Sequence, residues 1–226
     1  MPWLGFFHKI NMADVYVVLD NVKYKKLYFE NRNKIRTNDG WRWITIPLRR
    51  HSDDTFIKDI FIHRDLKQKK KRLNIIWQCY NKAEYFEFYW SKFEAIYSKD
   101  YNLLLDLNLE LINYFLKSLN IHTKIIFASD LDVTGTKSEL NFNICKALGA
   151  NTYISGISGR DYLDIQKFYN NGIEVVFQEF HHPIYKQLHE PFIPCMSVID
   201  LLFNHGEKSL DIINGVGVPV MDKVFL

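Results

Sequence analysis

The chain has 226 residues, of which 47% are hydrophobic and 24% charged, and its formal net charge is +3 at pH 7. These values are typical of a folded globular protein and exclude a disordered chain. They also exclude an extended basic platform for nucleic acid, although a slight positive charge suits an anionic substrate such as a sugar nucleotide. The sequence therefore predicts one domain over residues 1–226.

The cysteines and histidines do not indicate a metal site or a disulfide framework. The three cysteines lie far apart, without C-x-x-C spacing. The histidines with the best chance of forming a metal site are His181, His182, His189 and His205. Their spacing matches no ligand pattern of zinc or another transition metal, so we expect no metal.

Hydrophobic patterning gives no sign of export or of a membrane span. No apolar run reaches the roughly 18 to 20 residues that cross a bilayer. The first ten residues, M-P-W-L-G-F-F-H-K-I, lack the basic start and small-residue cleavage site of a signal peptide. We expect a cytoplasmic protein, and peripheral association with a membrane-bound machine stays compatible with this sequence.

The first third of the chain favours β structure. Residues 13–20, A-D-V-Y-V-V-L-D, are typical of a buried strand. A turn at 38–40, Asn-Asp-Gly, precedes an alternating run over 41–47 that predicts a strand exposed on one face. A shorter alternating run covers 57–63. Together these predict a parallel-type strand and then a small β excursion over about 40–63.

Residues 66–120 have apolar residues at helical spacing and contain neither proline nor glycine, which predicts about three helices. The basic run over 67–72 is interpreted as the solvated first turn of the first helix, with a patch for polyanions or membranes as the alternative. An aromatic stripe over 85–93 suits a sugar-stacking surface, but helical spacing favours a core role. We interpret this segment as a helical insertion or cap.

The second half of the chain alternates strands and helices. The predicted strands cover 124–128, 152–155 and 173–180; one helix begins at Thr136 and ends before Gly149, and the next begins at Ser158 and ends at 170–172. Such alternation implies right-handed crossovers and a parallel sheet. The predicted fold is α/β, with a Rossmann-like parallel sheet flanked by helices.

Ligands of parallel sheets bind at the carboxyl ends of the strands, which selects candidate residues directly. The residues that follow predicted strands are Asp20, Ser129, Asp130, Ser155, Gly156, Ser158, Gly159, Arg160, Asp161, His181 and His182. The loop S-G-I-S-G-R suits a diphosphate, because glycines permit close approach, the next helix offers N–H groups and Arg160 can bind phosphate bidentately. A loop that only reverses the chain is the equal alternative.

His181 and His182 lie where a strand gives way to a proline turn. A histidine there can take the proton from an attacking amine or hydroxyl. The alternative is that one of the pair packs and the other is exposed. No G-x-S-x-G elbow is present and Cys145 lies within a helix, so neither serine nor cysteine is indicated as a nucleophile.

An ordered set of motifs along the chain resembles a known family. The motifs are P-W-L-G-F-F at 2–7, A-D-V-Y-V-V-L-D at 13–20, N-R-N at 31–33, L-G-A-N-T-Y-I-S-G at 148–156, R-D-Y-L-D at 160–164, H-P-I-Y at 182–185 and S-V-I-D-L-L-F-N-H-G at 197–206. They resemble the WbqC-like proteins of bacterial O-antigen and capsule gene clusters. The resemblance implies a role in transferring glycine, or a similar acyl group, onto an amino sugar.

The resemblance and the strand-end residues together suggest roles for particular side chains. His182, or His181, would be the base; Gly156, Gly159 and Arg160 would hold a diphosphate or stabilise an oxyanion. The expected substrate-binding set is Asp20, Asn31, Arg32, Ser155, Gly156, Ser158, Gly159, Arg160, Asp161 and Tyr185. The acceptor would be a nucleotide-linked amino sugar, and the acyl donor a CoA thioester, an aminoacyl-tRNA or an ATP-derived adenylate.

Two other functions stay open at this point. One is a non-catalytic sugar-nucleotide-binding or scaffolding subunit of the polysaccharide machinery. The other is an ATP-dependent amide ligase, since the layout is also similar to nucleotidylyltransferase-like enzymes, although their H-x-G-H signature is missing. Relatives usually begin with a further strand and a Gln-Pro-x-x-x-Pro-Trp motif, whereas this chain begins at Met1-Pro2-Trp3, which puts binding and activity in question. The oligomeric state is not indicated.

Overall fold

The computed structural model describes residues 1–221. Backbone contacts divide the chain into two compact units, each assembled from separated stretches. The first unit comprises Met1–His8, Val22–His122 and the described chain from His181 onward. The second unit comprises Lys9–Asn21 and Thr123–Phe180. Each unit is described by itself, and the single domain that we predicted from the sequence stays a prediction.

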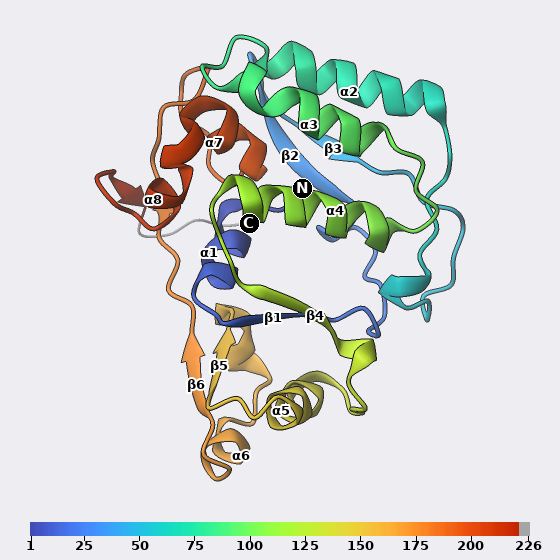
Figure 1. Ribbon diagram of the computed structural model, residues 1–226, viewed down its shortest axis with the longest axis vertical. Helices are drawn as coiled ribbons and strands as arrows, with labels where there is room; N and C mark the ends of the chain where they lie inside the picture. Colours follow the sequence, from blue (N-terminus) through green and yellow to red (C-terminus); the bar gives the residue numbers. More distant parts are fainter. Residues whose placement is uncertain (222–226) are drawn as a thin grey trace. The chain divides into compact units, whose positions relative to one another are not determined.

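Three helices form the largest part of the first unit: α2 (Leu66–Tyr80), α3 (Phe86–Ser98) and α4 (Leu104–Ser118). They lie alongside one another, and α3 packs against both neighbours (Figure 1). The side chain of Asp65 accepts a hydrogen bond from the Gln68 N–H and caps the start of α2. The three helices predicted over 66–120 are confirmed.

The aromatic stripe of α3 belongs to the core of the first unit. Phe86, Trp90 and Phe93 are buried, whereas Phe88 is on the opposite side of the helix and is 75% exposed. The ring of Phe93 lies 6.2 Å from that of Phe203, edge to face, which is a favourable geometry for aromatic pairs. This confirms the core interpretation of the stripe.

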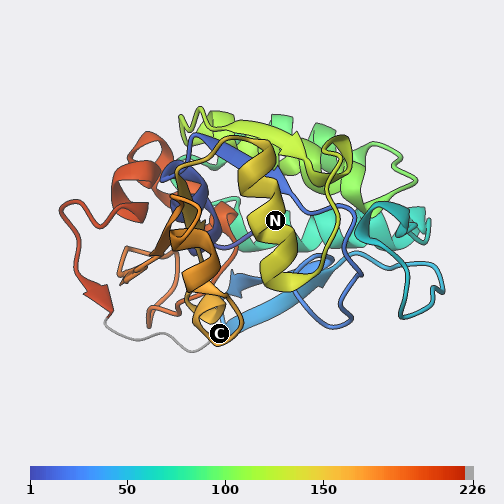
Figure 2. The ribbon, with the colours of Figure 1, turned by 90° about the horizontal axis from the view of Figure 1, so that it is seen from below.

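A β-hairpin of the first unit joins β2 (Arg32–Thr37) to β3 (Gly40–Thr45), as Figure 2 shows. The strands pair antiparallel, and Gly40 has a φ of 140°, a backbone angle that L residues rarely adopt. One face of the hairpin buries Ile35 and Ile44. The predicted turn and the second strand are confirmed, while the first strand lies in a stretch that the sequence pattern had not assigned.

The alternating run over 57–63 does not form a strand. It begins as a short 3₁₀ helix, η1 (Ile57–Asp59), and continues with isolated bridges, one of which joins Ile62 to Leu48. Ile60 within this run is fully buried beside Leu104. The alternation therefore reflects which side chains face the core, without a paired strand.

The last part of the first unit brings together α7 (Val198–His205), η4 (Gly206–Lys208) and α8 (Ser209–Ile213). Two short strands, β7 (His182–Pro183) and β8 (Val220–Met221), pair antiparallel. α7 is apolar over most of its circumference, and it contacts both α3 and β2. A helix with this pattern belongs inside the core.

The second unit contains two pairs of parallel strands. β1 (Val15–Val18) pairs with β4 (Lys124–Phe127), and β5 (Thr152–Ser155) pairs with β6 (Glu174–Phe177). The strands and their parallel direction agree with the sequence pattern. Within the described residues, however, they form separate two-stranded sheets, so the extended Rossmann-like sheet that we predicted is corrected to a mixed α/β arrangement.

The helices of the second unit match the sequence less evenly. α1 (Leu4–Asn11) belongs to the first unit up to His8, and only its last residues, which lead into β1, belong to the second; η2 (Ala128–Asp130) follows β4. α5 (Lys137–Ala147) begins after Thr136 and is followed by Gly149 with a φ of 62°, as predicted.

The predicted start of the next helix at Ser158 is wrong, whereas its predicted end at 170–172 is confirmed. A 3₁₀ turn, η3 (Ile157–Asp161), comes first. α6 (Ile165–Tyr169) begins only after Asp164, whose side chain accepts from the Lys167 N–H. A nearer cap therefore decides where this helix starts.

Candidate functional site

A buried polar network lies at the centre of the first unit, around Asp200 on α7. Asp200 is fully buried, and its Oδ2 accepts hydrogen bonds of 2.8 Å from the Tyr185 hydroxyl and from Gln187 Nε2. Gln187 also exchanges two hydrogen bonds of 2.8 Å with the backbone of Ile193. The network thus fixes the 185–193 segment against α7.

The Asp200 carboxyl group is in an environment that resists ionisation. Burial raises its pKa, although hydrogen bonding to Tyr185, Gln187 and Tyr80 and the charge of Arg36 act in the opposite direction. Its Oδ1 has no hydrogen-bond partner within residues 1–221. Burial and the nearby carboxylate also raise the pKa of the Tyr185 and Tyr80 hydroxyls well above the usual value. The two hydroxyls are therefore held in their protonated forms at neutral pH.

Arg36 completes the network from the hairpin. Its guanidinium is almost fully buried and donates to the carbonyl oxygens of Gly40 at 2.7 Å and Pro191 at 3.0 Å, and also to that of Thr37. Its backbone N–H donates to the Tyr80 hydroxyl at 2.9 Å. Because charge-assisted hydrogen bonds are strong, this one side chain ties the hairpin to the segment that carries the network.

His182, our sequence-predicted base, is fully buried in the same unit. Its Nδ1 lies 2.8 Å from the carbonyl oxygen of Pro183, and its Nε2 accepts from the Cys195 N–H at 3.0 Å. These partners require a neutral ring with the proton on Nδ1. Burial lowers the pKa of His182. Both ring nitrogens are engaged by the backbone, which favours a positioning role over proton transfer.

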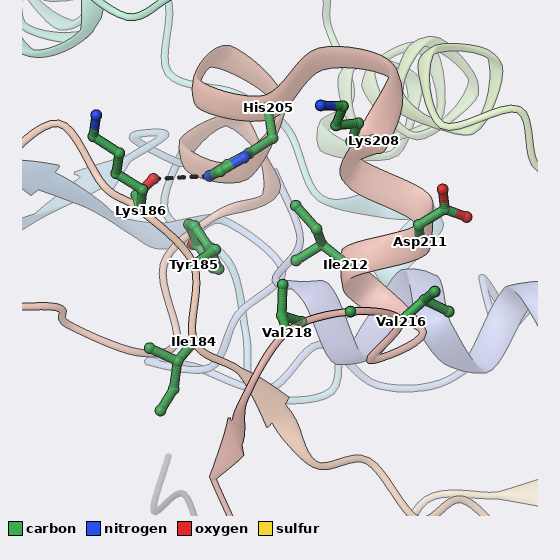
Figure 3. Close-up of a pocket in the computed structure, with 10 residues that line it drawn as sticks. Ile184, Tyr185, Lys186, His205, Lys208, Asp211, Ile212, Val216 and Val218 are labelled. Atoms are coloured by element: carbon green, nitrogen blue, oxygen red, sulfur yellow. Dashed lines mark hydrogen bonds between the residues drawn. The ribbon is translucent and has the colours of Figure 1, made fainter.

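A cavity of about 460 Å³ opens beside the buried network, entirely within the first unit (Figure 3). Its lining residues are Ile184, Tyr185, Lys186, His205, Lys208, Asp211, Ile212, Val216, Gly217 and Val218. Tyr185 and His205 meet edge to face, with ring centroids 5.6 Å apart. The volume lies within the usual range of about 300 to 1,000 Å³ for small-molecule sites.

His205 differs from His182 in its hydrogen bonding. Its Nε2 lies 2.9 Å from the carbonyl oxygen of Lys186, drawn as a dashed line in Figure 3. Since a carbonyl oxygen only accepts, Nε2 carries a proton and Nδ1 of the neutral ring keeps its lone pair. The exposed Lys186, Lys208 and Asp211 also line the cavity, so the two cations are partly offset by one carboxylate, and the Lys186 side chain points outward in Figure 3. This combination suits an anionic ligand that carries a group to be deprotonated.

Metal or thiolate chemistry has no support in the described residues. Residues 1–221 contain no cluster of three or more histidine, cysteine, aspartate or glutamate side chains arranged to hold a metal ion. Burial raises the pKa of the Cys145 and Cys195 thiols to about 11, so both are protonated at neutral pH.

In the second unit, the structure joins two of the predicted strand ends. Asp20 is buried, and its Oδ1 accepts from the Ser129 N–H at 3.0 Å, which links the carboxyl ends of β1 and β4. The neighbouring Asn21 has a buried Oδ1 without a hydrogen-bond partner among the described residues. The Asp20 carboxylate therefore binds the backbone of Ser129. The side-chain oxygen of Asn21 beside it would accept a hydrogen bond from a ligand or a water molecule.

The loop S-G-I-S-G-R is packed more tightly than a phosphate cradle requires. Ser155 Oγ donates to the Gly156 carbonyl at 3.0 Å. A Cβ on Gly159 would lie only 2.0 Å from that Oγ, so this glycine is needed for packing. Arg160 lies over the Phe177 ring at 4.9 Å. Ser158 and Asp161 are exposed.

Lys9 lies close to the start of this loop. Its Nζ lies 3.8 Å from where a Cβ on Gly156 would stand, and burial lowers the pKa of this lysine. A cation of the second unit therefore lies beside this loop.

The remaining predicted residues lie in the first unit. Asn31 accepts from the Tyr24 hydroxyl and donates to the Ile46 carbonyl, both at 3.0 Å. Arg32 lies over the Trp43 ring at 4.4 Å, and His181 is exposed. The sequence-predicted site residues therefore fall into two sets, one in each unit.

Sequence reasoning named Tyr185, and considered His205 only as a metal ligand, but it missed the other residues that build the network and the cavity. The signal for Asp200 was present, since a carboxylate inside the apolar run S-V-I-D-L-L-F indicates a buried acid that needs partners. His205 closes the same run. Arg36 gave no signal, because it is one of several basic residues in an alternating stretch.

Comparisons with known proteins place these residues in a family. A family model described as the WbqC-like protein family matches residues 1–212. The chain is also 30% identical over 221 residues to a protein of Mycobacterium tuberculosis (strain ATCC 25618 / H37Rv) described as uncharacterized protein Rv1507c, covering 93% of this chain and 92% of that protein. No solved structure matches the chain. From the match over residues 1–212, the chain belongs to the WbqC-like protein family.

Proposed function

We propose that this protein transfers a glycyl or similar acyl group onto the amine of a nucleotide-linked amino sugar, in the cytoplasmic steps of O-antigen or capsule synthesis. The observation that carries the proposal is the cavity in which two lysines flank a histidine with an available ring nitrogen. The resemblance to proteins of O-antigen and capsule clusters supplies the substrate class. The cavity would supply cations to bind the diphosphate and a histidine to act as the base.

The lysines would hold the negative end of the substrate. Lys186 and Lys208 offer ammonium groups to a diphosphate, and the apolar side chains of Ile212 and Val218 offer a surface to the sugar ring. The two lysine charges, partly offset by Asp211, would also raise the local concentration of an anionic substrate. With the diphosphate and the sugar ring held in this way, the sugar amine would face the ring of His205.

His205 would act as the base. As the amine nitrogen forms its bond to the acyl carbonyl carbon, Nδ1 takes one amine proton. The tetrahedral intermediate then breaks its bond to the leaving group, and the proton passes from the imidazolium to that group. The leaving group is the thiol of coenzyme A, the terminal hydroxyl of tRNA or AMP, according to the donor. His181 is the second candidate base, because it is exposed.

The decisive experiment supplies a UDP- or dTDP-linked amino sugar with glycine plus ATP, glycyl-tRNA or an acyl-CoA, and follows the product mass. We expect a mass increase equal to one acyl group. His205→Ala is expected to lose about a hundredfold or more in kcat, as removal of a general base does. Lys208→Ala is expected to raise KM. His122→Ala is the matched control, because His122 is exposed and outside the cavity.

The outcome also separates the competing functions. Product formation that is equal in the His205→Ala variant and the parent, with loss in His181→Ala, would transfer the base role to His181. Release of pyrophosphate in the ATP arm would identify the ligase alternative. Absence of product with every donor would sink the transferase proposal.

A non-catalytic binding subunit is the second candidate, favoured by the doubly hydrogen-bonded ring of His182. Such a protein would be stabilised thermally by the sugar nucleotide without any turnover. Calorimetric titration of the parent and of Lys208→Ala gives the affinity in either case. Binding without product under all donor conditions supports the binder over the enzyme.

A further inference from the structure

Apolar side chains gather at one exposed place on the first unit, next to the hairpin. The members of this aromatic tip are Leu27, Tyr28, Phe29, Trp41 and Trp43. Leu27 is 76% exposed and Trp41 is 44% exposed. The rings form a continuous series, with centroids 5.5 Å apart for Tyr28 and Phe29, 6.1 Å for Phe29 and Trp43, and 5.7 Å for the two tryptophans. Most exposed apolar residues are isolated, whereas these are contiguous.

The backbone of the tip is held in a specific conformation. Leu27 has a φ of 61°, in the left-handed region that residues with a Cβ rarely adopt. Arg32 donates a hydrogen bond to the Leu27 carbonyl oxygen, which holds the turn in this shape. An unfavourable backbone angle that projects a leucine into solvent indicates a use for that leucine.

Cations cover the faces of the rings. Lys25 Nζ lies 4.6 Å from the Tyr28 centroid, Lys34 Nζ lies 4.7 Å from that of Trp41, and the Arg32 guanidinium lies 4.4 Å from that of Trp43. None of these three cations takes part in a salt bridge among residues 1–221. The tip therefore combines apolar side chains that project into solvent with cations that form no salt bridge in the described residues.

The acidic groups nearby offset only part of this charge. Lys23 and Lys26 form ion pairs of 2.5 Å with Asp54 and Asp53, so those four charges compensate one another. Glu30 is partly buried; burial raises the pKa of its carboxyl group, while the charge of Lys25 lowers it, so Glu30 offsets part of the Lys25 charge. The hairpin turn adds one exposed acid, Asp39, against the cations Lys25, Arg32 and Lys34. The net charge presented around the aromatic tip is positive.

We propose that the aromatic tip docks this protein on an anionic lipid surface. Tryptophan and tyrosine favour the headgroup region, lysine and arginine pair with anionic lipids, and Leu27 would enter the acyl boundary. Stacking of a saccharide needs open ring faces, and cations of this chain already lie over one face of Tyr28, Trp41 and Trp43. The charge and the projecting leucine therefore select a membrane over an acidic polysaccharide. This proposal is independent of the acyltransferase proposal.

Vesicle co-sedimentation of the full chain tests the proposal, with phosphatidylglycerol mixed into phosphatidylcholine compared with phosphatidylcholine alone. We expect binding only with the anionic lipid and weaker binding at high salt. Leu27→Asn is expected to weaken binding about tenfold through lost apolar insertion. Asparagine tolerates the left-handed backbone, so this variant should keep its fold. Lys34→Gln is expected to weaken binding about fivefold.

Phe88→Asn is the matched control, because Phe88 is 75% exposed on α3 and is not part of the tip. It should bind vesicles like the parent. Equal binding to both vesicle types, equal affinities of Leu27→Asn and Phe88→Asn, or binding to polygalacturonate without binding to vesicles would overturn the proposal. Circular dichroism of each variant confirms that a loss of binding is not a loss of fold.

Discussion

Two histidines of the first unit show how hydrogen-bond partners decide the chemistry of identical side chains. His182 receives an N–H at one ring nitrogen and faces a carbonyl oxygen with the other, so its ring is committed to holding Pro183 and Cys195 in place. His205 faces a carbonyl oxygen with Nε2, which leaves the opposite nitrogen of the neutral ring with its lone pair. Position after a strand therefore did not suffice to identify the base.

Replacing His182 should change how stability depends on pH. Its folded-state pKa is lowered by burial, so below about pH 6.5 the unfolded chain takes up a proton that the folded chain resists. The stability contribution is thus present above pH 6.5 and is lost as pH falls through the lowered pKa. The maximal slope is about 1.4 kcal/mol per pH unit.

Urea unfolding of the parent and of His182→Gln at pH 7.5 and 5.5 measures this effect. The glutamine side chain offers an acceptor to the Cys195 N–H, so we expect the variant to fold and to lose about 1 to 3 kcal/mol at pH 7.5. The difference between the two proteins should shrink at pH 5.5. A constant difference would show that the pKa of the His182 ring is the same in the folded and unfolded protein.

The residues that the sequence could predict were those with local signals. Asp20 follows an apolar strand, and its place at the strand end is visible from the sequence. The partners of Asp200 come from distant points of the chain, since Tyr80 and Tyr185 are brought to α7 only by packing. Periodicity carries no information about such distant contacts.

At the scale of elements, the loop after β5 contains two glycines that differ in how closely their neighbours pack against them. Gly156 has open space apart from Lys9, whereas a Cβ on Gly159 would lie 2.0 Å from Ser155 Oγ and 2.9 Å from Leu163 Cδ1. The sequence pattern treated both as ligand-binding glycines. Packing within the loop distinguishes them, because one is required by its neighbours and the other is not.

Gly159→Ala should destabilise the second unit by about 1 to 3 kcal/mol, as overpacking does. Gly156→Ala is its matched control, because the added methyl group meets only the flexible end of Lys9. Thermal unfolding followed by circular dichroism compares the two variants. Equal unfolding midpoints of the two variants would show that the loop accommodates the methyl group at little cost in free energy, and would contradict the claim that packing requires a glycine at 159.

Element prediction succeeded where periodicity and end signals agreed, as for α5, with Thr136 before it and Gly149 after it. It failed for β2, because the basic and amide residues over 32–37 hide a half-buried strand. It also failed for 57–63, where alternation arises from core packing of Ile60 without strand pairing. In both segments, burial of side chains determines whether a strand forms more than the intrinsic strand preference of the residues does.

At the scale of the whole molecule, the five tryptophans provide a selective probe. They are Trp3, Trp41, Trp43, Trp77 and Trp90, and all belong to the first unit. Tryptophan fluorescence therefore reports on that unit alone, whereas far-UV circular dichroism reports on both. The predicted single domain requires that the two signals change together.

We expect coincident denaturant transitions from the two probes, because each unit is assembled from stretches that interrupt the other along the sequence. A mutation in the second unit, such as Gly159→Ala, should then shift the fluorescence midpoint too. A fluorescence transition that does not respond to that change would mean that the units unfold independently.

The division of the chain also fixes an order of events during synthesis. All of the second unit is available once residue 180 has emerged, whereas the first unit still lacks α7, on which Asp200 and the buried contacts of α3 and β2 depend. The helices α2 to α4 must therefore wait, with their aromatic faces uncovered, while about eighty further residues are added at roughly 5 to 20 residues per second. For several seconds the nascent protein would therefore expose the apolar surface of α3 that α7 later covers, and we expect ribosome-associated chaperones to bind it in that interval.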